Sequence, residues 1–310
     1  MTAYTKPYLV VPDQIKLLES RGMSVPDQGK AAEYLSRIGY YRLSAYWYLF
    51  RESERGSPPR FLDQFKPNSS FKVAVELYAF DKALRLQSLD VLERIEVAIR
   101  TPIALQIGQY DPWAHRSAQY LDRRFIQHHH ADWLRKLDEK ATDSKEEFAE
   151  HLRRRYSPSP MPIWIAVELL DFGPLSFLLS GLRRRDQTEI ALKLNVPRPE
   201  LLVSWIRALA LVRNICAHHA RLWNRPLVFQ PKLPQAGEIP LLDHLVSSPY
   251  ANRRIYAAAA VARYLLMEVN PRTRWADRLK AHLETFPTSP HLSLKTSGFP
   301  AAWENLPLWA

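Results

Sequence analysis

The residue types best suited to chemistry stand together in one stretch, Arg213-Asn214-Ile215-Cys216-Ala217-His218-His219. Arginine binds phosphate through a planar fork of N–H donors, and histidine titrates near neutral pH and can therefore both give and take a proton. An arginine, an amide and a pair of histidines on one segment form a minimal set of groups for work on a phosphodiester.

The exact spacing of these residues is not expected by chance. In a chain with 30 arginines and 10 histidines, the loose pattern of arginine followed by histidine four to six residues later carries little weight, and Arg123 and Arg124 also match it onto His128. The tighter pattern Arg-Asn-x-x-x-His is expected about 0.02 times by chance. It occurs only at Arg213, Asn214 and His218.

The apolar periodicity from Leu201 to Trp223 predicts one helix that carries all of these residues. On a helical wheel His219 falls within the apolar stripe, so we expect a buried, structural histidine there. His218 falls on the polar arc, where a substrate can reach it. The stripe comprises Trp205, Leu209, Val212, Cys216, His219 and Trp223, and the polar arc comprises Asn214, His218, Arg207 and Arg221.

The same wheel places Arg213 about 140° from His218, so one helix cannot easily aim both side chains at a single phosphate. Two copies related by a two-fold axis would supply an arginine and a histidine from different chains, which favours a homodimer. Cys216 lies in the apolar stripe, which indicates packing rather than a nucleophile.

Charge and composition point to a polyanionic partner. The formal net charge is +11, which favours nucleic acid first and an anionic membrane surface second. A single cysteine fits a reducing compartment, and residues 1–11 carry no secretory signal. The segment 255–269 is interrupted by Arg263 and is too short to span a bilayer, so we expect a cytoplasmic protein without a membrane partner.

The elements that position the motif are predicted to be helices, because glycine is scarce and apolar residues recur at three- and four-residue spacing. The fold class is therefore all-α, and residues 226–240 form an extended loop. We expect helices over 14–20, from 28 onward, over 71–100 with Pro102 at the end or at a kink, and over 163–170, 175–182, 250–269 and 272–283.

Two stretches are predicted to be irregular, and the tail is not. Residues 51–68, with Pro58-Pro59, are predicted to form a linker or a long loop, and 109–156 is the least regular region before a break at 157–162. The tail from 285 is proline-rich, yet its apolar residues predict docking on the body. They are Phe299, Trp303, Leu308 and Trp309.

Other candidate residues have ordinary explanations beside functional ones. Glu168 lies in an apolar segment, so we expect an arginine partner and, as the alternative, a role beside the active site. Three consecutive histidines on a helix point in different directions, which argues against a metal site at His128-His129-His130. Tyrosines 40, 41, 46 and 48 surround Arg42 and suit a core better than stacking on RNA.

Clusters of arginine are either solvated faces or RNA contacts. If they bind RNA, the binding will depend on salt. The clusters are Arg123 and Arg124; Arg153, Arg154 and Arg155; and Arg183, Arg184 and Arg185.

Several separated blocks resemble the bacterial Abi abortive-infection proteins of the AbiD and AbiF type, within the HEPN superfamily of RNases. The resemblance runs nearly end to end. The blocks are Leu35 to Tyr46, Glu93-Arg94-Ile95-Glu96 with Arg100, Pro162-Ile163-Trp164 to Gly173, Arg213 to Arg225, and Gly298-Phe299-Pro300 with Trp303.

The resemblance implies a multi-helix HEPN-like bundle and a metal-independent endoribonuclease without a cofactor, acting as a toxin or phage-defence effector. It implies Arg213 and His218 as the catalytic pair, with Asn214 supporting them and the role of His219 open. It also implies a homodimer with a composite active site. A noncoding RNA or a protein antitoxin would restrain the activity.

We expect a single unit over residues 1–310, comprising an N-terminal helical segment (1–60), a helical core (70–284) and a docked tail (285–310). The expected reaction is attack of a ribose 2′-hydroxyl on the adjacent phosphate, which leaves a 2′,3′-cyclic phosphate and a 5′-hydroxyl. The alternative is a non-catalytic RNA-binding or ribonucleoprotein-forming module of the same fold, in which Arg213 and Asn214 only pack.

Overall fold

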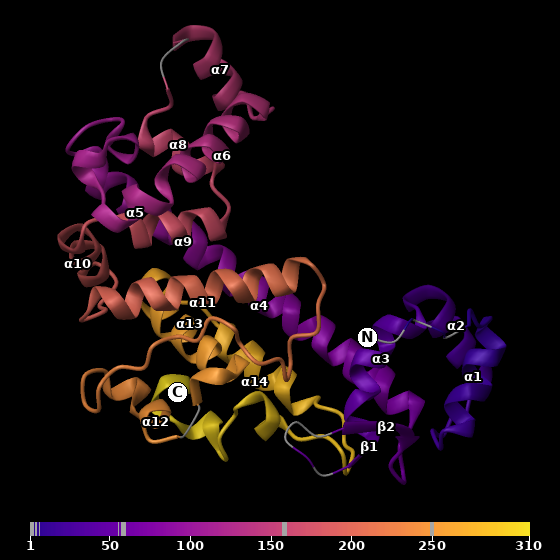
Figure 1. Cartoon of the computed structure of the whole chain (residues 1–310). Coiled ribbons are helices and arrows are strands. Elements are labelled where there is room, and N and C mark those ends of the chain that lie inside the picture. Colours follow the sequence, from indigo (N-terminus) through magenta and orange to yellow (C-terminus); the bar gives the residue numbers. More distant parts are fainter. Residues whose placement is uncertain are drawn as a thin grey trace.

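The computed structural model describes residues 3, 5, 7–54, 56, 60–156, 160–248 and 251–310. Within these residues there are 14 α-helices and one two-stranded sheet, which confirms the predicted all-α class. No helix in this part of the chain combines the length and apolar character needed to span a membrane. The helices form an N-terminal group, a central body and an upper lobe, and one long helix runs through all three (Figure 1).

The N-terminal group contains α1 (Val11–Ser20), α2 (Gln28–Ile38), α3 (Tyr40–Trp47), β1 (Arg51–Glu54) and β2 (Arg60–Phe65). The carboxylate of Asp27 caps α2 by accepting from the Lys30 amide at 2.9 Å. Gly39, at φ 91°, lets α3 begin directly after α2.

The prediction of a linker over 51–68 is wrong, because β1 and β2 form an antiparallel hairpin with Arg51 opposite Phe65. Its strands are short and largely polar, so they lack the alternating apolar pattern that predicts a strand. The cross-strand contact of Arg51 with Asp63 adds an ion pair to the ladder. Pro58 and Pro59 lie outside the described residues.

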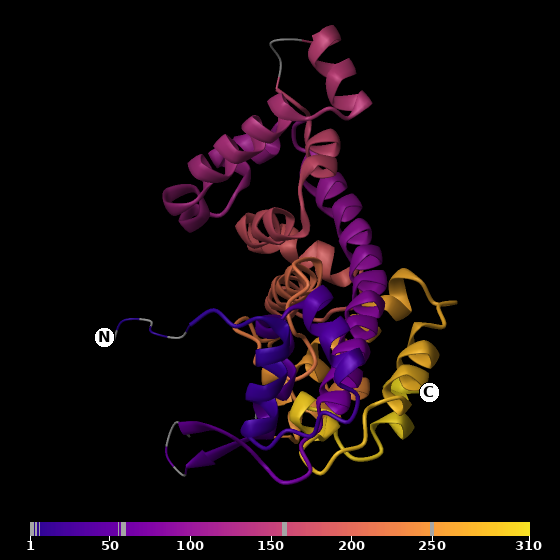
Figure 2. The ribbon, with the colours of Figure 1, turned by 90° about the vertical axis from the view of Figure 1, so that its right-hand side faces the viewer.

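Helix α4 (Phe71–Gly108) is 38 residues long and runs from the N-terminal group to the upper lobe in both views (Figures 1 and 2). Pro102 lies inside it, so the helix extends beyond the predicted end. The proline removes one backbone N–H, yet buried side chains on both sides of it keep the helix continuous. They include Ile95, Ile99, Ile103 and Ile107.

The upper lobe corrects the sequence prediction, because the stretch expected to be least regular is mostly helical. Asp122 caps the first of its helices by accepting from the amide of Arg124 at 2.9 Å. Position 181 must be glycine, since a Cβ there would lie 2.5 Å from the Phe125 ring. The helices are α5 (Arg123–His128), α6 (His130–Asp143), α7 (Glu147–Tyr156), α8 (Ile163–Leu169), α9 (Phe172–Gly181) and α10 (Arg184–Leu192).

The three consecutive histidines are divided between α5 and α6. His130 is buried and its Nε2 donates to the His115 carbonyl at 2.8 Å, whereas His128 and His129 are exposed. Across the described ranges, no cluster of three or more histidine, cysteine or acidic side chains is arranged to hold a metal. Residues 157–159 of the predicted break lie outside these ranges.

The central body contains α11 (Pro199–Ala217), α12 (Asp243–Val246), α13 (Ile255–Val269) and α14 (Trp275–Glu284). The tail docks on it as predicted. The indole of Trp309 donates to the Tyr256 hydroxyl at 3.2 Å, and the apolar residues of the tail are buried. These are Phe299, Trp303, Leu308 and Trp309.

Two hydrophobic clusters meet on α4. The smaller one contains residues of α1, α2, α3 and β2, which pack against Phe71, Ala74 and Val75 in the first turns of α4. The larger one begins at Tyr46 and Leu77 and includes the remaining helices of the body and the upper lobe. Helix α4 therefore contributes to both clusters and connects the N-terminal group to the body and the upper lobe.

Candidate active site

Helix α11 ends at Ala217, before both histidines. His218 is the C-terminal capping residue, and His219 has a left-handed backbone with φ 55°. The amide of Ala220 donates to the Ile215 carbonyl and that of His219 to the Cys216 carbonyl, both at 3.0 Å. This is a Schellman motif with histidine in the position that glycine usually takes.

The wheel prediction is therefore right for the helix, and beyond it right for His218 and Trp223 but wrong for His219. Trp205, Leu209, Val212 and Cys216 are buried as expected. His219 is exposed, not buried, because the left-handed residue turns the chain away from the helical face. His218 is exposed as predicted. The 140° angle assumed a helix that continues to His218, so it no longer bears on a dimer.

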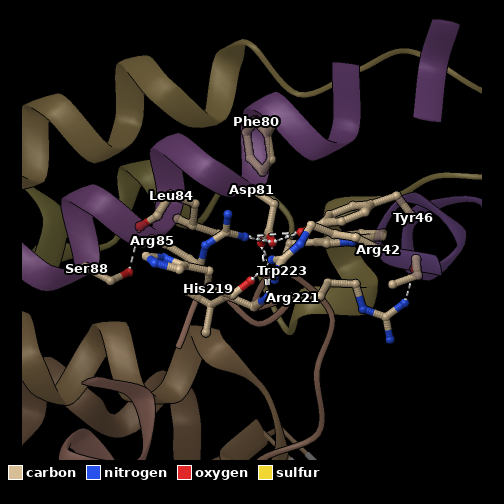
Figure 3. A network of polar contacts seen from close by, with 12 residues as sticks. Arg42, Tyr46, Phe80, Asp81, Leu84, Arg85, Ser88, His219, Arg221 and Trp223 are labelled. Atoms are coloured by element: carbon tan, nitrogen blue, oxygen red, sulfur yellow. Dashed lines mark hydrogen bonds and ion pairs between the residues drawn. The ribbon is translucent and has the colours of Figure 1, made fainter. Parts of the chain in front are cut away.

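The turn after α11 is fixed by Asp81 of α4, which is fully buried. Its carboxylate accepts hydrogen bonds from the amides of Leu222 at 3.2 Å and Trp223 at 2.7 Å. The Tyr46 hydroxyl donates to it at 2.8 Å, and the Arg85 guanidinium pairs with it (Figure 3). Burial raises the pKa of the Asp81 carboxyl, while these donors oppose that shift.

Helix α3 holds the same turn from the other side. Arg42 donates to the His219 carbonyl at 2.9 Å, and Arg221 donates to the Ala45 carbonyl (Figure 3). Burial lowers the pKa of the Arg221 guanidinium, and nearby Asp81 partly offsets this. Tyr46 is buried, which agrees with a core role, whereas Tyr41 is exposed. The backbone from His219 to Trp223 is thus bound to two helices far from it in sequence.

Arg213 lies one and a half turns before the histidines and contacts a different part of α4. Its Nε is 3.5 Å from the Glu96 carboxylate, and its guanidinium is 3.9 Å from Asp171 at the start of α9. It also donates to the Asn214 side-chain oxygen at 3.3 Å. Because Arg213 is partly exposed, its guanidinium remains accessible from outside.

The carboxylates around Arg213 have further partners. Arg100 donates to Glu96 at 2.9 Å, as the i,i+4 spacing predicts, and its guanidinium is 3.8 Å from Glu168. Lys140 of α6 pairs with Asp171 at 2.7 Å. Burial raises the pKa of Glu96, and Arg213 is the largest opposing influence. Glu168 has the predicted arginine partner, but it is exposed rather than buried.

Cys216 lies between the two contact regions and is buried. Burial raises the pKa of its thiol to about 12, with nearby Asp81 adding to the effect. The thiolate is the nucleophilic form, so this cysteine is inert at neutral pH. The sequence interpretation of Cys216 as a packing residue is confirmed.

The predicted site residues thus fall into two groups along α4. Arg213 and Asn214 lie near Glu96, while His219 and Arg221 lie beside Asp81, so the chain from Arg213 to Trp223 runs opposite to α4. Arg207 is exposed two turns before Arg213, with its guanidinium 3.9 Å from the centre of the Phe229 ring.

The arginine clusters belong to the upper lobe, and several of their members have local partners. Arg153 donates to the Ser144 carbonyl at 2.7 Å, so it ties α7 to the end of α6. Arg184 pairs with Glu200, and Arg183 and Arg185 lie over tyrosine rings. The exposed members include Arg123, Arg124, Arg154 and Arg155.

Sequence reasoning did not identify four residues that place the motif: Arg42, Asp81, Glu96 as a partner of Arg213, and Asp171. Two signals were available. Asp81 and Glu96 are acidic residues on the apolar face of a long helix, and such residues need buried partners. The partners within the motif could not be named, because Arg213, Leu222 and Trp223 are separated from α4 by more than 100 residues along the chain.

Comparisons with known proteins identify the family of the chain. A family model described as Abi-like protein matches residues 33–224, which is more than half of the chain. The matched range begins within α2 and ends directly after Trp223, so it contains α3, α4 and the polar contacts that these helices make with the motif. Comparisons with curated proteins and with solved structures give no match. The chain belongs to the Abi-like protein family.

Proposed function

We propose that this protein is a metal-independent endoribonuclease of the HEPN type. Membership of the Abi-like family suggests a role in abortive infection, a defence against phages. The observation that carries the proposal is an exposed histidine on a firmly anchored turn, five residues after an accessible arginine and an amide. The net charge of +11 supports a polyanionic substrate.

In the proposed reaction His218 takes the proton from a ribose 2′-hydroxyl or returns one to the leaving 5′-oxygen. Arg213 binds the phosphate that is attacked and stabilises the negative charge that develops on it. Its contacts with Glu96 and Asp171, at 3.5 and 3.9 Å, are longer than good hydrogen bonds. A phosphate can therefore take the open donors of the guanidinium without breaking a buried ion pair.

The test is incubation of purified protein with mixed RNA in the presence of EDTA. We expect cleavage that is lost in His218→Ala and reduced on the order of a hundredfold to a thousandfold in Arg213→Ala. His151→Ala, which removes an exposed histidine of α7, is the matched control and should cut like wild type. Identical fragment patterns from wild type and His218→Ala would rule out the nuclease.

The products test the chemistry separately. Attack by the 2′-hydroxyl predicts fragments that end in a 2′,3′-cyclic phosphate and begin with a 5′-hydroxyl. An RNA whose 2′-hydroxyls are methylated should resist cleavage. Cutting of the methylated RNA at the unmodified rate would contradict attack by the 2′-hydroxyl, even if His218 is required.

We also propose a homodimer in which each copy contributes to a composite site, as the resemblance to dimeric HEPN proteins implies. Light scattering should give twice the chain mass at micromolar concentration. Mixing Arg213→Ala with His218→Ala should give more cleavage than the two variants give separately if the two residues act across the interface. A fully active monomer would contradict this arrangement.

The second candidate is a non-catalytic RNA-binding module of the same fold, and one observation favours it. Arg213 faces two carboxylates, an arrangement that packing alone also produces. This candidate predicts salt-dependent RNA binding that is equal in wild type and His218→Ala, with no cleavage in either. A noncoding RNA or a protein antitoxin would be the natural regulator in both cases.

A further inference from the structure

A pocket lies beside Asn214, between helices α6, α9 and α11. Its volume is about 570 Å³, within the range of small-molecule sites. Its walls are mainly apolar, with Phe177 from α9 and Phe229 from the loop after α11. Both phenylalanines are more than a third exposed, so their rings are accessible to a ligand in the pocket.

A cationic side chain lies beside one of the two exposed rings. The guanidinium of Arg207 lies 3.9 Å from the centre of the Phe229 ring, close enough for a cation–π contact. Aromatic rings and arginine planes are the two surfaces on which proteins stack unpaired bases. The pair Arg207 and Phe229 therefore suits the flat face of a nucleobase better than an aliphatic ligand.

The polar groups of the pocket that contact Arg213 lie on one side, while Asp132, Lys136, Ser176 and Ser180 also line the pocket. The side-chain oxygen of Asn214 accepts from Arg213 at 3.3 Å, so its amide nitrogen is left to donate to a ligand. Lys140 and Asp171 line the same side and pair with each other at 2.7 Å. Asp171 is also 3.9 Å from Arg213.

A second cavity adjoins the pocket. It measures about 750 Å³, shares Lys140, Leu170 and Asp171 with the first, and extends to Arg100 and Glu168. The shared Asp171 carboxylate is 3.9 Å from the Arg213 guanidinium, so both cavities lie near the arginine proposed to bind the phosphate. A linear ligand can contact both cavities, whereas an isolated small molecule in the pocket contacts one.

We propose that the pocket between α6, α9 and α11 receives one unstacked base of a single-stranded RNA, whose backbone continues over Lys140 toward Arg213. The statement that this RNA is the one cleaved rests on the proposed nuclease function. Base-paired RNA cannot place a base there without opening the duplex, so the pocket selects single strands.

Binding is measured with full-length His218→Ala, which keeps the RNA intact. The probe is a short single-stranded RNA with 2-aminopurine at one position, and the competitors are the same sequence in a hairpin and adenosine monophosphate. We expect the single strand to bind at least tenfold more tightly than either, and the 2-aminopurine fluorescence to change on binding. Equal affinity for the hairpin or for the mononucleotide would overturn the proposal.

Phe229→Ala in the same background should weaken binding on the order of tenfold and abolish the fluorescence change. The matched control is Tyr156→Ala, which removes another exposed aromatic ring that lies under an arginine, 5.9 Å from Arg155. Circular dichroism verifies that both variants are folded. Equal effects of the two substitutions would contradict a base pocket at Phe229.

The outcomes separate this proposal from the proposed function. If the RNA binds through Phe229 but wild-type protein cuts nothing, the pocket stands and the nuclease is lost. If wild-type protein cuts RNA and Phe229→Ala binds it as tightly as its parent, the nuclease stands and the pocket is overturned.

Discussion

The two ends of the motif are held by the same helix in different ways. At the histidine end, a fully buried carboxylate, Asp81, accepts from backbone amides, from Tyr46 and from Arg85. At the arginine end, Arg213 lies 3.5 to 3.9 Å from the carboxylates of Glu96 and Asp171 and is partly exposed. The first arrangement fixes a backbone, whereas the second leaves a side chain free to exchange partners.

This difference matches what the two groups would do in catalysis. A general base must already be placed when the substrate arrives, because small displacements are costly for proton transfer. A phosphate-binding arginine must give up its resting contacts when the substrate binds. The comparison leads to four predictions, ordered from the largest expected change in stability to the smallest.

Asp81→Ala should have the largest effect. It leaves Arg85 without its buried partner and removes the acceptor of the Leu222 and Trp223 amides. Breaking one side of a buried ion pair costs about 3–5 kcal/mol of unfolding free energy. Urea denaturation measures the loss. A loss below about 1 kcal/mol would show that the turn is held by something other than Asp81.

Acid should lower the unfolding free energy through His115 of the upper lobe. Burial lowers the pKa of His115 to about 3. Between about pH 3 and pH 6.5 this imidazole is therefore neutral in the folded state and protonated in the unfolded state. Stability is therefore lost as the pH falls from about 6.5 toward 3, by about 2 kcal/mol at pH 5. Denaturation curves from pH 7 to 5 test this, and His115→Phe should have a flatter pH dependence.

His219→Gly should change stability in the opposite direction. The left-handed backbone at His219 costs a residue with a Cβ about 1 kcal/mol relative to glycine, so the substitution should raise the unfolding free energy by about that amount. Its effect on cleavage then isolates the imidazole, because the turn itself is retained. A destabilised variant would mean that the His219 side chain has contacts that hold the turn.

Asp171→Asn should have the smallest effect on stability, below about 0.5 kcal/mol, because Asp171 is exposed and its pairs with Lys140 and Arg213 are screened. Its effect on cleavage should be larger, since Asp171 orients Arg213. Thermal melting and initial rates on the same preparation give both numbers. If the substitution lowers the cleavage rate no more than it lowers stability, Asp171 does not orient Arg213.

Much of the fold could be predicted from periodicity. The long helix that begins at Phe71, the helix that carries Trp205 and Cys216, and the docked tail follow from apolar spacing. The hairpin at 51–65 and the helices of 109–156 were missed because their apolar positions are few. The hairpin depends on the burial of Phe65 in the N-terminal cluster, and the helices depend on caps such as Asp122 and on packing within the upper lobe.

The site could be predicted only in part. Type and spacing select Arg213, Asn214 and His218 as candidates. The end of the helix at Ala217 was not, because the left-handed position that ends it holds histidine instead of the usual glycine. The contacts with Asp81, Glu96, Asp171 and Arg42 join distant segments, and no local pattern in one sequence specifies such pairs.

Pro102 has a consequence for the motion of the molecule. It lacks an amide proton, so the Ala98 carbonyl one turn earlier has no partner within α4. This weak point follows Glu96 and precedes the last turns of α4, which belong to the upper lobe (Figure 2). A slight tilt about residues 98–102 would move α6 relative to Arg213, while α9, which packs along α11, and the turn at Asp81 stay in place. Amide hydrogen exchange along α4 should therefore be slowest between Leu77 and Ile95 and faster beyond the proline.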